Sequence, residues 1–389
     1  MVEWKRIKQL ELGLIMSVDI REVKGRRDLR AFIFLPKKIH AHHKNWGPPI
    51  YMDEKKYFNP KKNKAFSYCD TILLLAFRGK DAVGRVMGII NSRYNQYKEE
   101  RTARFGYLET EKDEEGVNAL LDFLEDWARK KGMNKIVGPY GFSDQDPEGF
   151  LIEGFENRPT IATYYNFEWM PRFVEKRGYS KEVDYFVYRI DVPREFPEFY
   201  KRIYERVKKR GGFDILEFKK RRELKPWINS VLYLMNECYV GSDIYGYAPL
   251  DEEEMAALAK RYLPVIDPRF VKVVKKGDEV VAFIVGMPDL TEGIQKARGR
   301  LFPLGFLKIL RAAKKTKQLD LLLGAIKEEH RGRGLDVLMG TKMILSAHEA
   351  GLEIIDTHHE METNTRVRAE MERMGGKVYK RFRIYQKKI

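Results

Sequence analysis

The amino-acid sequence predicts an α+β fold made of two similar domains in tandem, each a mixed, mainly antiparallel sheet flanked by helices. Two observations support this prediction. The chain has 389 residues, which exceeds the usual size of a single hydrophobic core and makes two domains the first expectation. The same order of elements, a hairpin followed by a strand, a helix and a strand, also occurs twice. We place the domains at residues 1–195 and 196–389.

The first of these repeats begins with a hairpin. Apolar runs at 71–77 and 82–90 flank a turn at Arg78-Gly-Lys-Asp81, which is the pattern of two antiparallel strands joined by a short loop. The elements that we expect to follow are a strand at 104–108, a helix from about 117 to 131 and a strand at 135–137.

The second repeat has the same order. Apolar runs at 270–274 and 280–285 flank a turn at Lys275-Lys-Gly-Asp278. The elements expected after this hairpin are a strand at 319–326, a helix from Leu335 to Gly351 and a strand at 352–358. Between the repeats, a proline-containing segment at 192–197 precedes a basic helix that ends at Arg210-Gly-Gly212, which indicates a domain boundary in this region.

The composition excludes several classes of protein. Hydrophobic residues make up 43% and aromatic residues 12% of the chain, which is not typical of a disordered protein. Cys69 and Cys238 are too few and too far apart for a disulfide framework or a CxxC site, which fits a reducing cytoplasm. No charge-free apolar run approaches the roughly 20 residues that span a bilayer. We therefore expect a cytoplasmic protein, soluble or peripheral on the inner face of the membrane.

The N-terminus lacks the apolar region of a signal peptide. Residues 1–15 are interpreted as a leader or a start-site artefact, and we assign no function to them. The segment that starts at Met16 has the pattern of a first strand.

The tetrapeptide Arg331-Gly-Arg-Gly334 lies between an apolar run that ends at Ile326 and a helical pattern that begins at Leu335. The first N–H groups of a helix lack intrahelical partners, and the helix dipole adds positive charge there. Two glycines would let an anion approach the bare backbone, and two arginines add charge. The turn is therefore either a phosphate-binding site or, in so basic a chain, a solvated or RNA-contacting loop.

This turn, the strand before it, the helix and strand after it, and Asn364 before a last helix form one pattern. In this pattern the chain resembles the acyl-CoA loop and following segment of the GNAT acyltransferase superfamily. Nearly the whole chain also resembles a bacterial branch of tandem GNAT proteins, similar to the N-acyltransferases proposed to make bacterial ceramides. The segments that carry the wider resemblance are Asn45–Lys55, Gly138–Ser143, Gly149–Phe155, Gly299–Gly305 and Tyr379–Tyr385.

The resemblance implies an N-acyltransferase that moves an acyl group from acyl-CoA to an amine, with a lipid or sphingoid-type acceptor as one candidate. In such a reaction the amine attacks a thioester carbonyl, an oxyanion develops and a thiolate leaves. By the same resemblance, the backbone N–H near Ile326 or Lys327 would stabilise the oxyanion. The residues implied in acyl-CoA binding are Ile326, Lys327, Arg331, Gly332, Arg333, Gly334 and Leu335.

The chain departs from the superfamily pattern at two positions. Asp336 stands where a glycine or alanine is usual; an acid in the first helical turn suits the dipole but competes with a bound phosphate. An acyl carrier protein, whose prosthetic arm carries one phosphate instead of a pyrophosphate, is therefore an alternative donor. Met371 stands where many members have a tyrosine that protonates the sulfur, so no side-chain acid is implied.

The two halves differ where a donor would bind. After the first-half strand at 104–108, residues 109–115 contain five carboxylates, which would repel a pyrophosphate. We therefore expect the second domain alone to bind acyl-CoA. The first domain is then a degenerate copy that frames the acceptor site.

Polar residues gather where the last predicted strand ends, beside the expected thioester. If the strand continues, alternation sends His358, Glu360 and Glu362 to one face, where two carboxylates would tune a base. Glu362 and Asn364 also match an acid-x-Asn pattern in the resembling branch. We predict Glu362, Asn364 and His358 as catalytic residues, and the alternative is a solvated strand end. No HExxH or CxxC spacing indicates a metal ligand set, so we predict no metal.

A second group of polar residues lies in the first half, in three segments that are dense in acids, glycine and aromatic residues: 143–149, 153–159 and 164–169. These segments either line a pocket for a cationic amine or form a long loop packed on its own aromatic side chains. The residues predicted to bind the acceptor are Asp144, Glu148, Tyr164 and, from the second half, Asp289.

The net charge is +16, and residues 293–319 supply half of it, with eight lysines and arginines and no acid. Leucine and phenylalanine alternate with these cations, so a basic amphipathic helix is predicted over 300–317. Such a helix favours an anionic membrane surface. The alternative is a helix that packs on the core and leaves its lysines in solvent.

Nucleic acid is the competing partner. A pI near 9.5 with scattered aromatic residues fits binding to a phosphate backbone. Two other functions therefore stay open: a non-catalytic basic GNAT-fold protein that binds nucleic acid or membrane, and a tRNA-dependent aminoacyltransferase.

Overall fold

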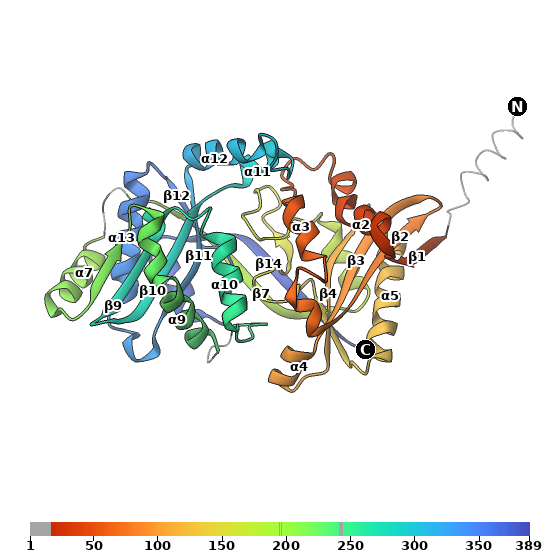
Figure 1. The fold of residues 1–389 in the computed structure, drawn as a ribbon, viewed down its shortest axis with the longest axis horizontal. Coiled ribbons are helices and arrows are strands. Elements are labelled where there is room, and N and C mark those ends of the chain that lie inside the picture. Colours follow the sequence, from red (N-terminus) through yellow and green to blue (C-terminus); the bar gives the residue numbers. More distant parts are fainter. Residues whose placement is uncertain (1–16, 194, 196, 241–243) are drawn as a thin grey trace, which may run out of the picture. The chain divides into compact units, whose positions relative to one another are not determined.

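A computed structural model of the chain describes residues 17–193, 195, 197–240 and 244–389, so our expectation for residues 1–15 lies outside them. The chain forms two compact units, which are drawn in Figure 1. Unit 1 comprises the described residues up to Phe150, with Asn166–Glu182 and Ile384–Ile389. Unit 2 comprises Leu151–Tyr165 and Val183–Arg383.

This division differs from the single boundary that we predicted at residue 195. The long strands β7 (Ser180–Asp191) and β14 (Lys377–Lys388) each contribute residues to both units. The last residues of β14 pair with β5 (Lys135–Gly138) in unit 1, and the last residues of β7 pair with β12 (Ile354–Asp356) in unit 2. A chain whose late strands complete both units has no single cut point in its sequence.

Unit 1 is a mixed sheet in the order β1-β2-β3-β4-β5-β14, in which β4–β5 is parallel and the other pairs are antiparallel. Its further strands are β1 (Val18–Glu22), β2 (Cys69–Arg78), β3 (Asp81–Asn91) and β4 (Thr102–Thr110). Its helices are α2 (Gly25–Ile39), α3 (Tyr51–Tyr57), the 3₁₀ helix η1 (Lys64–Ser67), α4 (Ser92–Lys98), α5 (Glu114–Lys130) and α6 (Trp169–Lys176). The predicted hairpin, strand, helix and strand are confirmed.

Helices cover both faces of the unit 1 sheet. On one face α5 lies so close to β3 that a Cβ added at Gly88 would be 2.3 Å from Leu124 Cδ1. On the other face Met87 and Ile89 pack with Phe32 of α2 in a buried cluster. Successive residues of β3 thus serve opposite layers, as the period of a strand requires.

Unit 2 is a mixed sheet in the order β7-β12-β11-β10-β9-β8, in which β11–β12 is parallel and the other pairs are antiparallel. Its further strands are β8 (Asp214–Glu217), β9 (Val271–Lys276), β10 (Glu279–Pro288) and β11 (Gln318–Ile326), while β13 (Glu360–Met361) pairs with β7 and β6 (Phe150–Glu153) pairs with β14.

The α-helices of unit 2 are α7 (Glu198–Arg210), α8 (Arg221–Leu224), α9 (Ile228–Val240), α10 (Glu252–Tyr262), α11 (Thr291–Ala297), α12 (Gly305–Lys315), α13 (Leu335–Glu349) and α14 (Thr365–Arg373). Its 3₁₀ helices are η2 (Lys225–Trp227), η3 (Pro268–Phe270) and η4 (Glu328–His330). The predicted second hairpin, the basic helix that ends at Arg210 and the helix in the insertion 293–319 are confirmed. In the described part of the chain, no helix combines the length and apolarity needed to cross a bilayer.

Two helical layers also cover the unit 2 sheet. Val207 of α7 and Leu335 of α13 pack with Val274 on one face. Met235 of α9 packs with Val273 on the other. This packing fixes the N-terminus of α13 beside α7.

Candidate active site

The candidate site lies in unit 2, where β11 and β12 separate. Their parallel pairing covers only Gln318–Asp320 and Ile354–Asp356, after which the chain beyond β12 pairs with β7 through Glu360. β11 continues to Ile326 along β10. The edge of β11 from Leu321 onward therefore has no strand partner among the described residues.

Backbone groups of β11 point to this open edge. Lys327 N–H donates to Val281 O at 2.9 Å, which makes Ala282 and Ile326 a non-hydrogen-bonded pair of the antiparallel ladder. The N–H groups of Ile326 and, two residues earlier, Gly324 therefore point away from β10. Arg331 Nε approaches Ile326 O from that side at 3.2 Å.

These contacts correct one prediction. Lys327 N–H is already bonded within the sheet, so it cannot stabilise an oxyanion without breaking the β10–β11 ladder. Ile326 N–H stays a candidate, and Gly324 N–H joins it. A bulge at Leu322, opposite the step from Val285 to Gly286, bends the strand just before these residues.

The glycine turn that follows β11 leaves the start of α13 uncapped. Gly332 has φ +72° and Gly334 has φ +84°, a left-handed backbone that favours glycine. No side chain caps α13 at Gly334. Among the described residues, Leu338 N–H is the first of the helix to reach a carbonyl, that of Gly334 at 2.9 Å. The earlier N–H groups are thus available to an anion.

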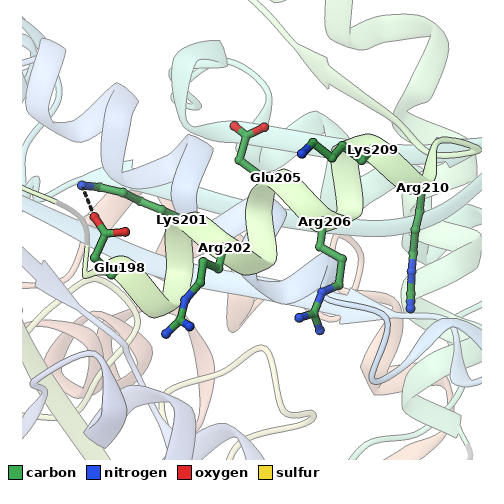
Figure 2. A pocket seen from close by; sticks show the side chains of 7 residues that line it. All are labelled: Glu198, Lys201, Arg202, Glu205, Arg206, Lys209 and Arg210. Atoms are coloured by element: carbon green, nitrogen blue, oxygen red, sulfur yellow. Dashed lines mark hydrogen bonds and ion pairs between the residues drawn. The ribbon is translucent and has the colours of Figure 1, made fainter.

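Cations surround this turn. Arg331 and Arg333 are exposed, and α7, which packs on α13, carries cations on its outer face. Figure 2 shows the side chains that line a shallow depression on α7, where Lys201 pairs with Glu198 at 2.9 Å. The lining residues are Glu198, Lys201, Arg202, Glu205, Arg206, Lys209 and Arg210.

The corresponding helix start in unit 1 is filled by the protein itself. The Asp113 carboxylate accepts from Gly116 N–H at 3.0 Å and caps α5, whose first turn also holds Glu114 and Glu115. Burial acts to raise the pKa of Asp113, but the hydrogen bonds from Arg78 and Gly116 outweigh it and lower the pKa. A carboxylate thus occupies the place that a donor phosphate would need. This is consistent with the predicted degeneracy of the first half.

Two buried aspartates lie side by side where β11 and β12 separate. Asp320 and Asp356 are partners in the parallel register, and both are fully buried. Lys380 Nζ lies 3.2 Å from Asp356 Oδ2, and the Tyr379 hydroxyl donates to the same oxygen. Gln318 Nε2 donates to Asp320 Oδ1 at 2.8 Å.

Asp320 has fewer hydrogen-bond partners than Asp356. Its Oδ2 atom is buried without a hydrogen-bond partner in the described structure. Burial, followed by the negative charges of Asp356 and Asp289, raises the pKa of Asp320 well above its ordinary value. The charged form of Asp320 is therefore disfavoured in the folded protein.

Asp289, predicted to bind the acceptor, belongs to the same cluster. Its carboxylate accepts from Thr291 N–H at 2.9 Å, and the Thr291 hydroxyl donates to Pro159 O at 2.9 Å. Sequence reasoning missed Asp320, Asp356, Tyr379 and Lys380 as site residues. The available signal was an acid at 320 within an otherwise apolar strand, which is costly unless a partner is buried with it.

The strand does not continue from His358 to Glu360, so the alternation on which the shared face depended is absent. β12 ends at Asp356, and His358 has φ +57°, which interrupts the extended backbone before β13 resumes at Glu360. His358 N–H donates to Asp356 Oδ1 at 2.7 Å. Its Nε2 lies 2.9 Å from Ile161 O and must carry the proton in that contact. Burial lowers the pKa of His358, so the ring is neutral.

The acids and the amide after this break have different surroundings. Asp184 N–H donates to Glu362 Oε1 at 3.2 Å. Asn364 directly precedes α14, and its side chain makes no capping hydrogen bond to the helix. Burial raises the pKa of Glu360 to about 8. The Glu360 carboxyl has no hydrogen-bond partner in the described part of the chain, and the residue is partly buried.

Of the predicted acceptor residues of the first half, Glu148 and Tyr164 are buried and Asp144 is partly buried. Burial raises the pKa of Asp144 to about 7, and its Oδ1 atom lacks a hydrogen-bond partner among the described residues. Glu148 is buried in unit 1, and Tyr164 is buried in unit 2. The loop that carries Asp144 is anchored by Asp146, whose carboxylate accepts from the Tyr57 hydroxyl and from Phe142 N–H, each at 2.8 Å.

Comparison with known proteins gives matches over nearly the whole chain. The sequence is 30% identical over 383 residues to the bacterial ceramide synthase of Caulobacter vibrioides, covering 96% of this chain and 98% of that protein. It is 24% identical over 384 residues to Protein YghO of Escherichia coli, covering 95% of each chain. A solved tandem GNAT protein from the clavulanic acid biosynthesis pathway matches with a TM-score of 0.54 at 12% identity, over 96% of this chain and 98% of that one. No protein-family model matches the chain.

The tandem α+β fold is that of tandem GNAT proteins, and the enzyme class is that of an N-acyltransferase. The chain belongs to the family that includes the bacterial ceramide synthase. The resemblance inferred from the sequence, the fold class and the assignment as an acyltransferase are confirmed.

Proposed function

We propose that this protein transfers an acyl group from acyl-CoA to the primary amine of a lipid-like, sphingoid-type acceptor. The observation that carries the proposal is the uncapped N-terminus of α13 directly after the open edge of β11. A pantetheine thioester needs both features, an anion site for its phosphates and a strand edge for its amide-rich arm.

The donor phosphates would lie at the N–H groups of the glycine turn, with Arg331 and Arg333 beside them. The thioester carbonyl would then lie along β11, where the N–H groups of Gly324 and Ile326 point to the open edge. These donors would stabilise the oxyanion that forms when the amine attacks.

The base that takes the proton of the amine is proposed among the acids after β12. Glu362, Asn364 and His358 stay predictions from the sequence. Glu360 joins them because burial raises its pKa to about 8. A general base is most effective when its pKa is close to the pH at which the enzyme works. The neutral ring of His358 fits a positioning role, since its Nε2–H is bound to Ile161 O.

The acceptor class is supported by the relative named bacterial ceramide synthase, since a ceramide is the amide of a fatty acid and a sphingoid amine. Within unit 2, Asp289 and the ring of Tyr164 are proposed to bind this amine. Asp144 and Glu148 of unit 1 stay predictions from the sequence. The acceptor would be taken at a membrane surface by a protein on its cytoplasmic side.

An acyl carrier protein is the second candidate donor. The specific observation in its favour is the cationic outer face of α7 next to the glycine turn, since carrier proteins are acidic. Exposed Asp336 in the first turn of α13 also disfavours a pyrophosphate more than a single phosphate.

The test is an acyl-transfer assay on the full chain with acetyl-CoA, palmitoyl-CoA and palmitoyl-acyl carrier protein, each with sphinganine and with a water-soluble amine. Mass spectrometry of the amide product should show transfer to sphinganine from a long-chain donor. No amide with any pairing, together with no thermal stabilisation by any donor, would overturn the proposal.

A double variant tests whether the donor binds at the glycine turn. Arg331→Ala with Arg333→Ala should raise KM for the donor by about ten- to a hundredfold, because two charge-assisted contacts to phosphate are lost. The matched control is Lys275→Ala with Lys276→Ala, which removes two cations from the end of β9 and should leave KM unchanged.

A further inference from the structure

Five large apolar side chains stand in solvent within nine residues around the start of α12. Phe302 is 72% exposed and Leu304 60%, and the helix itself presents Phe306, Leu307 and Leu310. These five residues are called the α12 patch. They are a third of the 15 exposed large hydrophobic side chains in the described structure. These side chains are therefore concentrated around α12 and are not scattered evenly over the surface.

The exposure of the patch follows from how α12 is held. Its opposite face packs on α11, where Gly305, Ile309 and Ala312 are buried. A Cβ added at Gly293 of α11 would lie 2.5 Å from Ile309 Cα, so the two backbones are in close contact. Since α12 cannot rotate without losing this contact, its second apolar face is fixed toward solvent.

Cations border the patch. At about 100° per residue, Lys314 falls between Leu307 and Leu310 around the helix, and Arg311 falls just beyond Leu307. Neither Arg311 nor Lys314 makes an ion pair with any described residue, and both are exposed. Residues 293–319 contain eight cations and no acid. The apolar and the positive surfaces are therefore adjacent on one exposed side of α12.

We propose that the α12 patch docks the protein on an anionic membrane surface. The five apolar side chains enter the headgroup region, and the bordering cations lie at the level of the lipid phosphates. Docking is a binding event that requires no acyl transfer, so it stands or falls separately from the proposed function.

Other occupants fit these observations less well. A second copy of the chain in a two-fold contact would bring like charges together across the interface. A nucleic acid would engage the cations but leave five apolar side chains without a partner. A bilayer with acidic lipids meets both surfaces at once.

The test is flotation of the full chain with vesicles of phosphatidylcholine, or of phosphatidylcholine with one third phosphatidylglycerol. Wild type should bind the phosphatidylglycerol vesicles at least about tenfold more tightly than the neutral ones. Phe306→Glu with Leu310→Glu should weaken binding to both by about tenfold or more, because two inserting side chains are lost.

Charge and apolar contributions are separated by a second variant. Arg311→Glu with Lys314→Glu should reduce binding to the phosphatidylglycerol vesicles toward the level of the neutral ones. The matched control is Phe123→Glu with Leu345→Glu, which changes two exposed apolar side chains of α5 and α13 and should bind like wild type. Circular dichroism checks that each variant is folded.

Three results would overturn the proposal. The first is unchanged vesicle binding by Phe306→Glu with Leu310→Glu. The second is a loss of binding in the charge variant alone, which would assign the surface to a soluble polyanion. The third is a change of oligomeric state in the patch variant by light scattering, which would assign the patch to a second copy.

Discussion

Gly332 and Gly334 show how two neighbouring glycines can be required for different reasons. Both have a left-handed backbone. A Cβ at Gly332 would meet nothing within 4 Å, whereas a Cβ at Gly334 would lie 2.7 Å from Val207 Cγ2 of α7. Gly332 therefore serves the conformation of the turn alone, and Gly334 also allows α7 to approach α13.

This difference predicts unequal costs of substitution. Gly332→Ala should destabilise the protein by about 1–2 kcal/mol, the cost of a left-handed alanine. Gly334→Ala should cost about 2–4 kcal/mol, because steric overlap with α7 is added. Urea denaturation followed by circular dichroism measures both.

Gly340 provides the control within α13. A Cβ there meets nothing within 4 Å and the residue lies inside the helix, so Gly340→Ala should stabilise the protein by about 0.5–1 kcal/mol. Equal effects of the substitutions at 332 and 334 would contradict the role assigned to α7 packing.

Glu360 gives a pH-dependent prediction. Its pKa is raised to about 8 by burial, and a base is active when deprotonated, so its contribution to kcat/KM should rise with pH and level off above about 8. Glu360→Gln should lower kcat by about 10²–10⁴ and remove this limb of the profile. The amine of the acceptor contributes a limb of its own, which the variant should keep.

Two comparison variants make the assignment specific. Glu362→Gln tests the residue predicted from the sequence, and Glu353→Gln changes an exposed acid outside the site. If Glu362→Gln removes the limb and Glu360→Gln does not, the base is Glu362. Loss of the limb in Glu353→Gln as well would mean that the profile does not report a base at this site.

At the scale of elements, the pair Asp320–Asp356 joins β11 to β12 at the point where the strands separate. The two aspartates differ in their hydrogen-bond partners. Asp356 is satisfied by Lys380, Tyr379 and His358 N–H, while Asp320 is buried with a raised pKa. A carboxyl with a raised folded pKa binds a proton that the unfolded chain has released, so stability falls as pH rises above the unfolded pKa of about 4.

Asparagine substitution should therefore act oppositely at the two positions. Asp320→Asn should raise the melting temperature at pH 8 and change it little at pH 4, because it removes the cost of holding a proton. Asp356→Asn should destabilise the protein by about 3–5 kcal/mol, because Lys380 is left as a buried charge with weaker partners. Thermal unfolding at the two pH values measures both, and destabilisation by Asp320→Asn at pH 8 would contradict the raised pKa of Asp320.

The sequence predicted the elements whose signals are local. Both hairpins follow from a turn between two apolar runs, and the glycine turn before α13 follows from a strand and a helical pattern on either side. The break at His358 was not predictable, because the ring contacts Ile161 O, which lies 197 residues earlier in the chain. The buried Lys380 was equally hidden, since its partner lies 24 residues earlier in the chain.

At the scale of the whole molecule, the chain order does not follow the unit order. β7 and β14 contribute to both units, so that a division based on composition near residue 195 could not find them. The difference between the two helix starts was predictable, because five carboxylates at 109–115 contrast with two arginines and two glycines at 331–334. The structure adds the reason, which is that Asp113 caps α5 whereas α13 has no side-chain cap.

The most direct test of the central claim is hydrogen–deuterium exchange of the full chain with and without saturating coenzyme A, and with and without acyl carrier protein. If the donor binds at the start of α13, one of these ligands should slow exchange in peptides covering 326–337 and leave peptides covering 109–117 unchanged. Protection at 109–117, or no protection at 326–337 with either ligand, would contradict a donor site at the glycine turn.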